Sequence, residues 1–170
     1  PMSRGLGDVY KRQVYNNYDE IIKDKNINAI YIATLNNTHF ELIKKCSENN
    51  KNILCEKPFT LNYDEGREVY DYITKNRVIF YEGFAYRSHP QTKIIQDIVQ
   101  NNELGEIKNI QSSFGFKINK IKPDSRLFDK KLGGGAILDV GCYPLSILNL
   151  FYKDPDLSLI HISEPTRHRR

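Results

Sequence analysis

The chain has 170 residues, of which 39% are hydrophobic, 27% charged and 11% aromatic. This length fits one domain or a piece of a larger protein, and the apolar content excludes a disordered chain. No apolar run approaches the roughly 20 residues that cross a bilayer, and residues 1–20 lack the apolar stretch of a signal peptide. The sequence therefore predicts a globular, cytoplasmic protein with no membrane partner.

The formal net charge of +4 is concentrated at the two ends of the chain. Residues 1–13 and 158–170 each carry three basic residues and one acidic residue, whereas the two signs balance in residues 14–157. Because residues 14–157 have no net charge, they lack the excess of positive charge that binds DNA or RNA, and no nucleic-acid partner is expected. Both ends resemble translations of sequencing-adapter DNA, and we expect them to be non-native tracts. The alternative is a pair of native basic tails.

The three cysteines, Cys46, Cys55 and Cys142, form no CxxC motif, and no paired histidines accompany them. An odd, scattered set of cysteines is typical of a reducing compartment. The sequence therefore predicts neither a disulfide framework nor a metal site.

Helical and strand patterns alternate between residues 14 and 87. Helical spacing predicts helices over 18–23, 38–49 and 62–76, and short apolar runs predict buried strands over 29–33, 52–55 and 78–81. Strands that alternate with helices form a parallel sheet with right-handed crossovers. We therefore expect residues 14–87 to be the C-terminal part of a Rossmann domain, which is half of a doubly wound α/β sheet.

The pattern changes after Gly83. His89-Pro90 opens a predicted helix, and residues 110–119 alternate strictly between apolar and polar, as in an antiparallel strand with one exposed face. A glycine run at 133–135 precedes a last predicted helix that extends to residue 151. Residues 88–157 are therefore expected to start an α+β domain with an open antiparallel sheet.

Three motifs stand near these elements: Ala33–His39 (ATLNNTH), Cys55–Pro58 (CEKP) and Gly133–Tyr143 (GGGAILDVGCY). The first two directly follow predicted strands. Ligands of doubly wound sheets bind beyond the carboxyl ends of the strands, so both motifs fall in the expected binding region.

In order and spacing, the three motifs resemble those of the glucose-fructose oxidoreductase, inositol dehydrogenase and MocA family, in the branch of dihydrodiol and xylose dehydrogenases. The resemblance covers residues 14–156. It implies an NAD- or NADP-dependent oxidoreductase that transfers a hydride between nicotinamide and a sugar, polyol or diol carbinol. It also implies a homo-oligomer formed through the antiparallel sheet. The alternative is a non-catalytic Rossmann-type sensor or structural homologue that binds a nucleotide or sugar without turnover.

The family's glycine-rich phosphate loop is missing from this sequence, and Leu35 stands where a proline is common in the family. We therefore expect the chain to carry half of the cofactor site, and to be inactive without the rest of the protein. The resemblance places cofactor contacts at the first two motifs: Thr34, Leu35, Asn36, His39, Glu56, Lys57 and Pro58.

Two of these residues also have simpler interpretations. His39 stands where a helix begins and is an ordinary polar residue for that position. Without the surrounding motif, Lys57 would be interpreted as a solvated loop lysine. A cation next to a proline in a loop of fixed shape can, however, neutralise a developing alkoxide.

The family's catalytic positions fall on Tyr143, Lys57 and Asp139. Asp139 and Tyr143 are four residues apart, which places them on one face of an α-helix. A phenol is a poor base at pH 7, but an ammonium about 4 Å away would favour its phenolate by on the order of 4 kcal/mol. The hypothesis is that Lys57 makes Tyr143 a competent base while Asp139 orients the substrate. Arg87 is expected either to hold substrate hydroxyls or a cofactor phosphate, or to form a salt bridge at the domain boundary.

Overall fold

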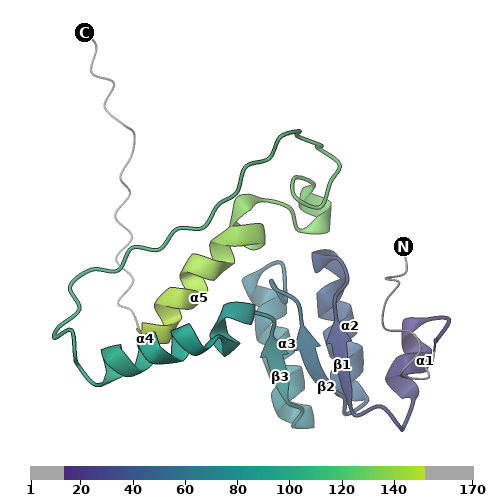
Figure 1. Cartoon of the computed structure of the whole chain (residues 1–170). Coiled ribbons are helices and arrows are strands. Elements are labelled where there is room, and N and C mark those ends of the chain that lie inside the picture. Colours follow the sequence, from purple (N-terminus) through teal and green to yellow (C-terminus); the bar gives the residue numbers. More distant parts are fainter. Residues whose placement is uncertain (1–13, 152–170) are drawn as a thin grey trace, which may run out of the picture.

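The structure is a computed structural model, and it describes residues 14–151. The two predicted non-native tracts, at 1–13 and 158–170, lie outside the described residues. Figure 1 shows a small parallel sheet backed by helices, followed by two further helices joined by a long irregular segment. We call residues 14–88 the Rossmann half and residues 89–151 the C-terminal half.

The Rossmann half contains the predicted alternation of helices and strands. Its elements are α1 (Tyr18–Lys23), β1 (Ala29–Ile32), the 3₁₀ turn η1 (Asn36–Thr38), α2 (His39–Glu48), β2 (Asn52–Cys55), α3 (Tyr63–Asn76), β3 (Phe80–Glu82) and the 3₁₀ turn η2 (Ala85–Ser88). The three strands are parallel and lie in the order β1-β2-β3. The predicted α/β fold class is confirmed.

One face of the sheet carries the hydrophobic core. Right-handed crossovers place α2 and α3 on the same face, where they pack against each other (Figure 1). Ile32, Ile53 and Cys55 point from the strands into this layer and are at most 3% exposed. From the helices, Ile43 and Val69 are among the residues that pack into the core.

The opposite face of the sheet is uncovered in the described part of the chain. Because side chains alternate along a strand, Tyr31, Leu54 and Tyr81 point away from the core. The register pairs Tyr31 with Leu54 and Leu54 with Tyr81, so the three side chains form one row across the sheet. They are 57%, 45% and 68% exposed. We call this row the open-face stripe.

The C-terminal half contains α4 (Pro90–Gln100), the 3₁₀ turn η3 (Lys130–Leu132), the π-helical turn η4 (Ile137–Gly141) and α5 (Cys142–Phe151). Helix α4 begins as predicted, with His89 capping it and Pro90 in its first turn. Helix α5 follows the long irregular segment in the chain and packs against α4 (Figure 1).

The predicted antiparallel strand over residues 110–119 is not formed in the described part of the chain. These residues have no strand partner, and Phe114 and Phe116 are each 55% exposed. A strand needs a second strand alongside to satisfy its backbone N–H and C=O groups. The alternation indicates which side chains share a face, but it does not supply that partner.

The C-terminal half also contains the described helical segment that could span a membrane by length and composition, Lys130–Phe151. Two polar side chains of this segment, those of Asp139 and Ser146, contact the Rossmann half and are 9% and 6% exposed.

Candidate active site

The predicted site residues gather where the carboxyl ends of β1, β2 and β3 meet the C-terminal half. Several side chains connect the two halves across this boundary. The Asn36 amide donates a hydrogen bond to the Gly133 carbonyl at 3.3 Å, Lys57 contacts Asp139, and Arg87 contacts Ser146. The carboxyl edge predicted to bind a ligand is therefore also the seam between the two halves.

The glycine run fits closely against the first motif. Gly133 is buried with φ of +78°, and a Cβ there would lie 2.9 Å from the Asn36 Cβ and 2.4 Å from a Leu61 methyl carbon. Any side chain would separate the two halves at this point, which is why glycine is required here.

Lys57 lies at the centre of the site. It follows β2, precedes the cis-proline Pro58, and donates a hydrogen bond to the Asp139 backbone carbonyl. Its Nζ is also 3.9 Å from the Asp139 carboxylate and 5.0 Å from the centroid of the Tyr143 ring. The structure thus brings together the three residues predicted to be catalytic.

The pKa of Tyr143 differs from the prediction. Lys57 lies over the face of the ring, and the pKa of Tyr143 is raised, first by burial and then by Cys142, Glu56 and Asp139. The expected lowering of this pKa by Lys57 is therefore wrong for this arrangement, because desolvation and nearby anions disfavour the phenolate. Within the described residues the Tyr143 hydroxyl has no hydrogen-bond partner.

Asp139 lies in a π-helical turn, which the prediction of one continuous α-helix missed. The Cys142 N–H donates to the Ile137 carbonyl five residues back, and α5 begins only at Cys142. The Asp139 carboxylate accepts a hydrogen bond from Arg126 at 3.0 Å. Lys57 nevertheless contacts both Asp139 and Tyr143, although Asp139 lies in the π-helical turn and Tyr143 in the α-helix that follows it.

His39 is fully buried beneath the loops. Its Nδ1 lies 2.8 Å from the Pro58 carbonyl oxygen and its Nε2 lies 3.3 Å from that of Thr34. In the described structure the ring thus connects the first two motifs and does not face solvent. Both ring nitrogens face backbone oxygens, and the cofactor contact expected of His39 stays a prediction.

The remaining predicted contacts lie on the rim. The hydroxyl groups of Thr34 and Thr38 are 2.6 Å apart, and Leu35 is 44% exposed before η1. Glu56 accepts a hydrogen bond from the Tyr31 hydroxyl on the open face of the sheet. These side chains lie beside the site, and the charge of Glu56 acts on Tyr143.

Several residues at the site were not predicted. Arg126 comes from an irregular segment, which has no periodicity to mark it. Glu82 on β3 accepts the Phe59 N–H at 3.1 Å and so supports the loop after Lys57, and burial raises its pKa. The Tyr143 ring is surrounded by three aromatic rings with centroids 5.1–6.1 Å away, those of Phe84, Tyr86 and Phe114.

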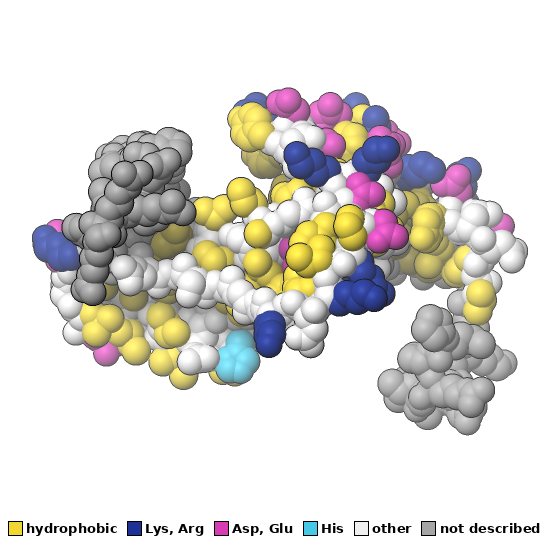
Figure 2. All heavy atoms as spheres, turned by 90° about the horizontal axis from the view of Figure 1, so that it is seen from above, with side chains coloured by type: hydrophobic (Ala, Val, Ile, Leu, Met, Phe, Trp, Pro, Cys, Tyr) yellow, Lys and Arg dark blue, Asp and Glu magenta, His cyan; other side chains and the backbone are white. Residues whose placement is uncertain are grey.

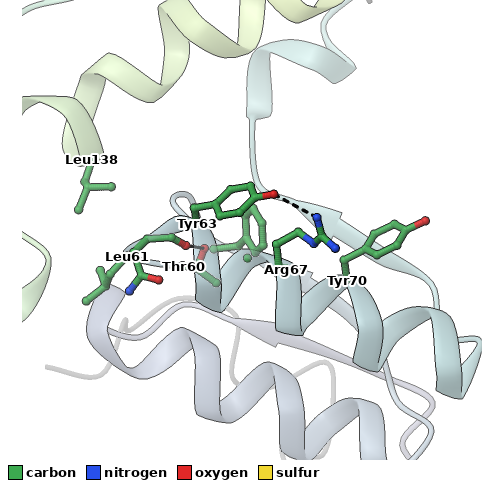
Figure 3. A pocket seen from close by; sticks show the side chains of 9 residues that line it. Thr60, Leu61, Tyr63, Arg67, Tyr70 and Leu138 are labelled. Atoms are coloured by element: carbon green, nitrogen blue, oxygen red, sulfur yellow. Dashed lines mark hydrogen bonds between the residues drawn. The ribbon is translucent and has the colours of Figure 1, made fainter.

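Besides a hollow of about 750 Å³ that Glu56, Phe84 and Arg87 border, two smaller hollows flank the site. One of about 280 Å³ borders Asp139 and is mainly apolar, with Phe114, Phe116 and Phe128 in its wall. The other, of about 530 Å³, lies outside the Pro58 loop (Figure 3). In Figure 3, Leu138 points across this second hollow toward Leu61, and no predicted site residue lines it.

A parallel α/β sheet with a lysine and an amide at its carboxyl edge, closed by the π-helical turn of Asp139 and the helix of Tyr143, defines a protein of the Rossmann-type class. Comparison with known proteins agrees with this class. The profile of an oxidoreductase family with an NAD-binding Rossmann fold matches residues 3–84, and that of the GFO/IDH/MocA C-terminal domain matches residues 92–165. The chain belongs to the GFO/IDH/MocA family.

Similar proteins include D-xylose 1-dehydrogenase (NADP(+)) 2 of Haloferax volcanii, which is 35% identical over 142 residues, 84% of this chain and 43% of that protein. Trans-1,2-dihydrobenzene-1,2-diol dehydrogenase of Xenopus tropicalis is 34% identical over 82% of this chain and 42% of its own length. The chain thus spans less than half the length of these relatives.

Solved structures agree on the fold. An aldose-aldose oxidoreductase from Caulobacter crescentus gives a TM-score of 0.73 at 22% identity, over 81% of this chain and 41% of that one. A 3-ketoreductase from Actinomadura kijaniata, solved with NADP, gives 0.68 at 26% identity, over 79% of this chain and 41% of that one.

Proposed function

We propose that the whole protein carrying this chain is an NAD- or NADP-dependent oxidoreductase that interconverts a carbinol and a carbonyl on a sugar, polyol or diol. One observation carries the proposal: the Tyr143 hydroxyl, without a hydrogen-bond partner in the described residues, lies on a ring contacted by Lys57 and next to the Asp139 turn. A phenol in this setting is available to exchange a proton with a substrate oxygen.

The residues at the strand ends fit the nicotinamide half of a dinucleotide. They supply an amide, hydroxyls and a lysine at the carboxyl edge of a parallel sheet, where such cofactors bind. Asn36, Glu56 and Lys57 would hold it, with Thr34 and Leu35 on the rim, and His39 and Pro58 would keep the loops in place. When bound, the nicotinamide supplies the hydride donor or acceptor.

Proton transfer is the part of the reaction that Tyr143 would perform. Because its pKa is raised, Tyr143 is protonated at neutral pH and donates to the oxygen of a carbonyl substrate during reduction. In oxidation the phenolate form of the same oxygen accepts the proton of the substrate hydroxyl. Lys57 stabilises negative charge that develops at the substrate oxygen, and Asp139, held by Arg126, positions substrate hydroxyl groups.

The site and the named relatives support this substrate class. A xylose dehydrogenase and dihydrobenzenediol dehydrogenases are among the similar proteins, and both act on compounds with neighbouring oxygens. The apolar hollow beside Asp139 would receive the carbon skeleton while Asp139 contacts a hydroxyl. We further propose a cytoplasmic enzyme that assembles with itself through its C-terminal half.

The test is turnover of the whole protein with NAD and NADP on a panel of aldoses, inositols and vicinal diols, followed by the absorbance of reduced nicotinamide. We expect activity with at least one class and one cofactor. Cofactor binding without turnover on any of them would instead support a non-catalytic sensor.

A further inference from the structure

Ser146 joins α5 to the end of the Rossmann half. It is 6% exposed, and its hydroxyl oxygen accepts hydrogen bonds from the Tyr86 hydroxyl at 2.8 Å and from Arg87 Nε at 3.1 Å. Arg87 Nη2 also donates to the Ser146 carbonyl at 3.3 Å. Two consecutive residues of η2 thus hold one residue of α5. We call these three residues the η2–α5 latch.

The latch lies directly beside Tyr143. Residues three apart on an α-helix share a face, so Ser146 and Tyr143 both point toward η2. The Tyr143 ring packs edge-on against Phe84, with centroids 5.3 Å apart, and lies 6.1 Å from the ring of Tyr86. Tyr86 therefore contacts Tyr143 with its ring and Ser146 with its hydroxyl.

The latch is well suited to set the position of Tyr143. The Tyr143 hydroxyl makes no hydrogen bond within the described residues, so the ring is placed by packing and by the helix that carries it. The hydrogen bonds of Ser146 restrict sliding and rotation of that helix on η2. A misplacement of about 1 Å can cost about 100-fold in rate.

We propose, on the basis of the proposed function, that Ser146 is a positioning residue that holds Tyr143 at its place in the reaction through Tyr86 and Arg87. Arg87 then acts at the boundary between the halves and not as a substrate contact. This agrees with the boundary position expected for it, although its partner is a serine and not an acidic residue.

The first experiment compares Ser146→Ala with Ser146→Thr in the whole protein. Ser146→Ala should lower kcat by roughly 10- to 100-fold while the KM for the cofactor changes less than about twofold. Ser146→Thr keeps the hydroxyl and should restore most of the rate. Asn149→Ala, an exposed position on the same helix, is the control and should leave kcat unchanged. An unchanged kcat in Ser146→Ala would overturn the proposal.

The second experiment reads the position of Tyr143 without turnover. The protein is labelled with 3-fluorotyrosine, and the Tyr143 resonance is assigned through Tyr143→Phe. Ser146→Ala should shift this fluorine resonance and lower the titration midpoint of Tyr143, because the ring becomes more exposed to water; Ser146→Thr should do neither. A resonance unmoved by Ser146→Ala would overturn the proposal.

A third variant covers the case in which Ser146→Ala does not fold. Tyr86→Phe removes one donor of the latch and should produce a smaller shift of the same resonance; no shift would overturn the proposal. If the panel of substrates shows no turnover, the proposed function fails, but the fluorine measurement still decides whether the latch positions Tyr143.

Discussion

At the scale of single residues, Tyr143 is the side chain on which the proposed chemistry depends. Replacing it with Phe keeps the ring contacts with Phe84 and Lys57 and removes only the hydroxyl. We expect Tyr143→Phe to lower kcat about 100-fold or more, the usual scale for loss of an acid–base group, with little change in cofactor affinity. Steady-state kinetics and cofactor titration measure both. A variant with most of its activity would exclude Tyr143 from the mechanism.

The raised pKa of Tyr143 predicts opposite pH dependences for the two directions of the reaction. Oxidation needs the phenolate, so its rate should keep rising with pH up to a midpoint above the ordinary tyrosine value of 10.0. Reduction needs the protonated phenol, so its rate should be highest at lower pH and fall through the same midpoint. Profiles of kcat/KM in both directions test this. An oxidation rate that levels off near pH 7 would indicate another base.

At the scale of elements, the strands and helices of the Rossmann half were predictable because each has a local signal. The strand at 52–55 matches the prediction at both ends, and that at 29–33 is one residue shorter. Short continuous apolar runs bounded by loops identify such strands. The strand predicted over 110–119 failed because pairing depends on a second segment, which alternation does not describe.

The site was predicted in part for the same reason. Lys57, Asp139 and Tyr143 are each in a recognisable motif, and the sheet brings them together. Arg126 and Ser146 were missed, since one lies in an irregular loop and the other resembles any small polar residue on a helix. The environment of Tyr143 was also predicted wrongly. The distance from Tyr143 to the Lys57 charge can be estimated from the sequence. The desolvation of the Tyr143 ring depends on Phe84, Tyr86 and Phe114, which come from distant segments.

The buried contact between α2 and the two loops makes a prediction at this scale. His39→Ala would leave the Pro58 carbonyl without its buried partner, so we expect the free energy of unfolding to fall by about 1–3 kcal/mol. Urea unfolding followed by circular dichroism measures the change. Glu41→Ala, at an exposed position on the same helix, is the control and should change stability by less than about 0.5 kcal/mol. A similar, small effect for both variants would contradict the role of His39.

At the scale of the whole molecule, the two halves present different surfaces. Figure 2 shows charged side chains gathered over the helices that back the sheet, while fewer of them appear on this face of the part that contains α4 and α5. Ile94, Leu104 and Phe116 are each more than half exposed there. Exposed apolar area of this kind is typical of surfaces that other protein covers.

The open-face stripe makes the last prediction. We expect the 170-residue chain alone to self-associate, because three exposed apolar side chains in register present a contiguous hydrophobic surface. Leu54→Lys, in the middle of the stripe, should reduce the apparent mass on a sizing column with light scattering. Tyr70→Lys, equally exposed but on α3, is the control and should have little effect. A wild-type chain that is strictly monomeric would contradict the prediction.

The wide turn at Ile137–Gly141 bears on how such a protein can diverge. Each residue of an α-helix advances the chain by about 100°, so removing one residue from this turn would restore regular winding and point Asp139 in another direction. Tyr143 and the latch lie after the turn and would keep their places. Deleting one residue there would thus change the proposed orientation of the substrate by Asp139 without changing the proposed proton transfer by Tyr143. Under the proposed function, a change of length in this turn would alter how the substrate is held while keeping the same acid–base group.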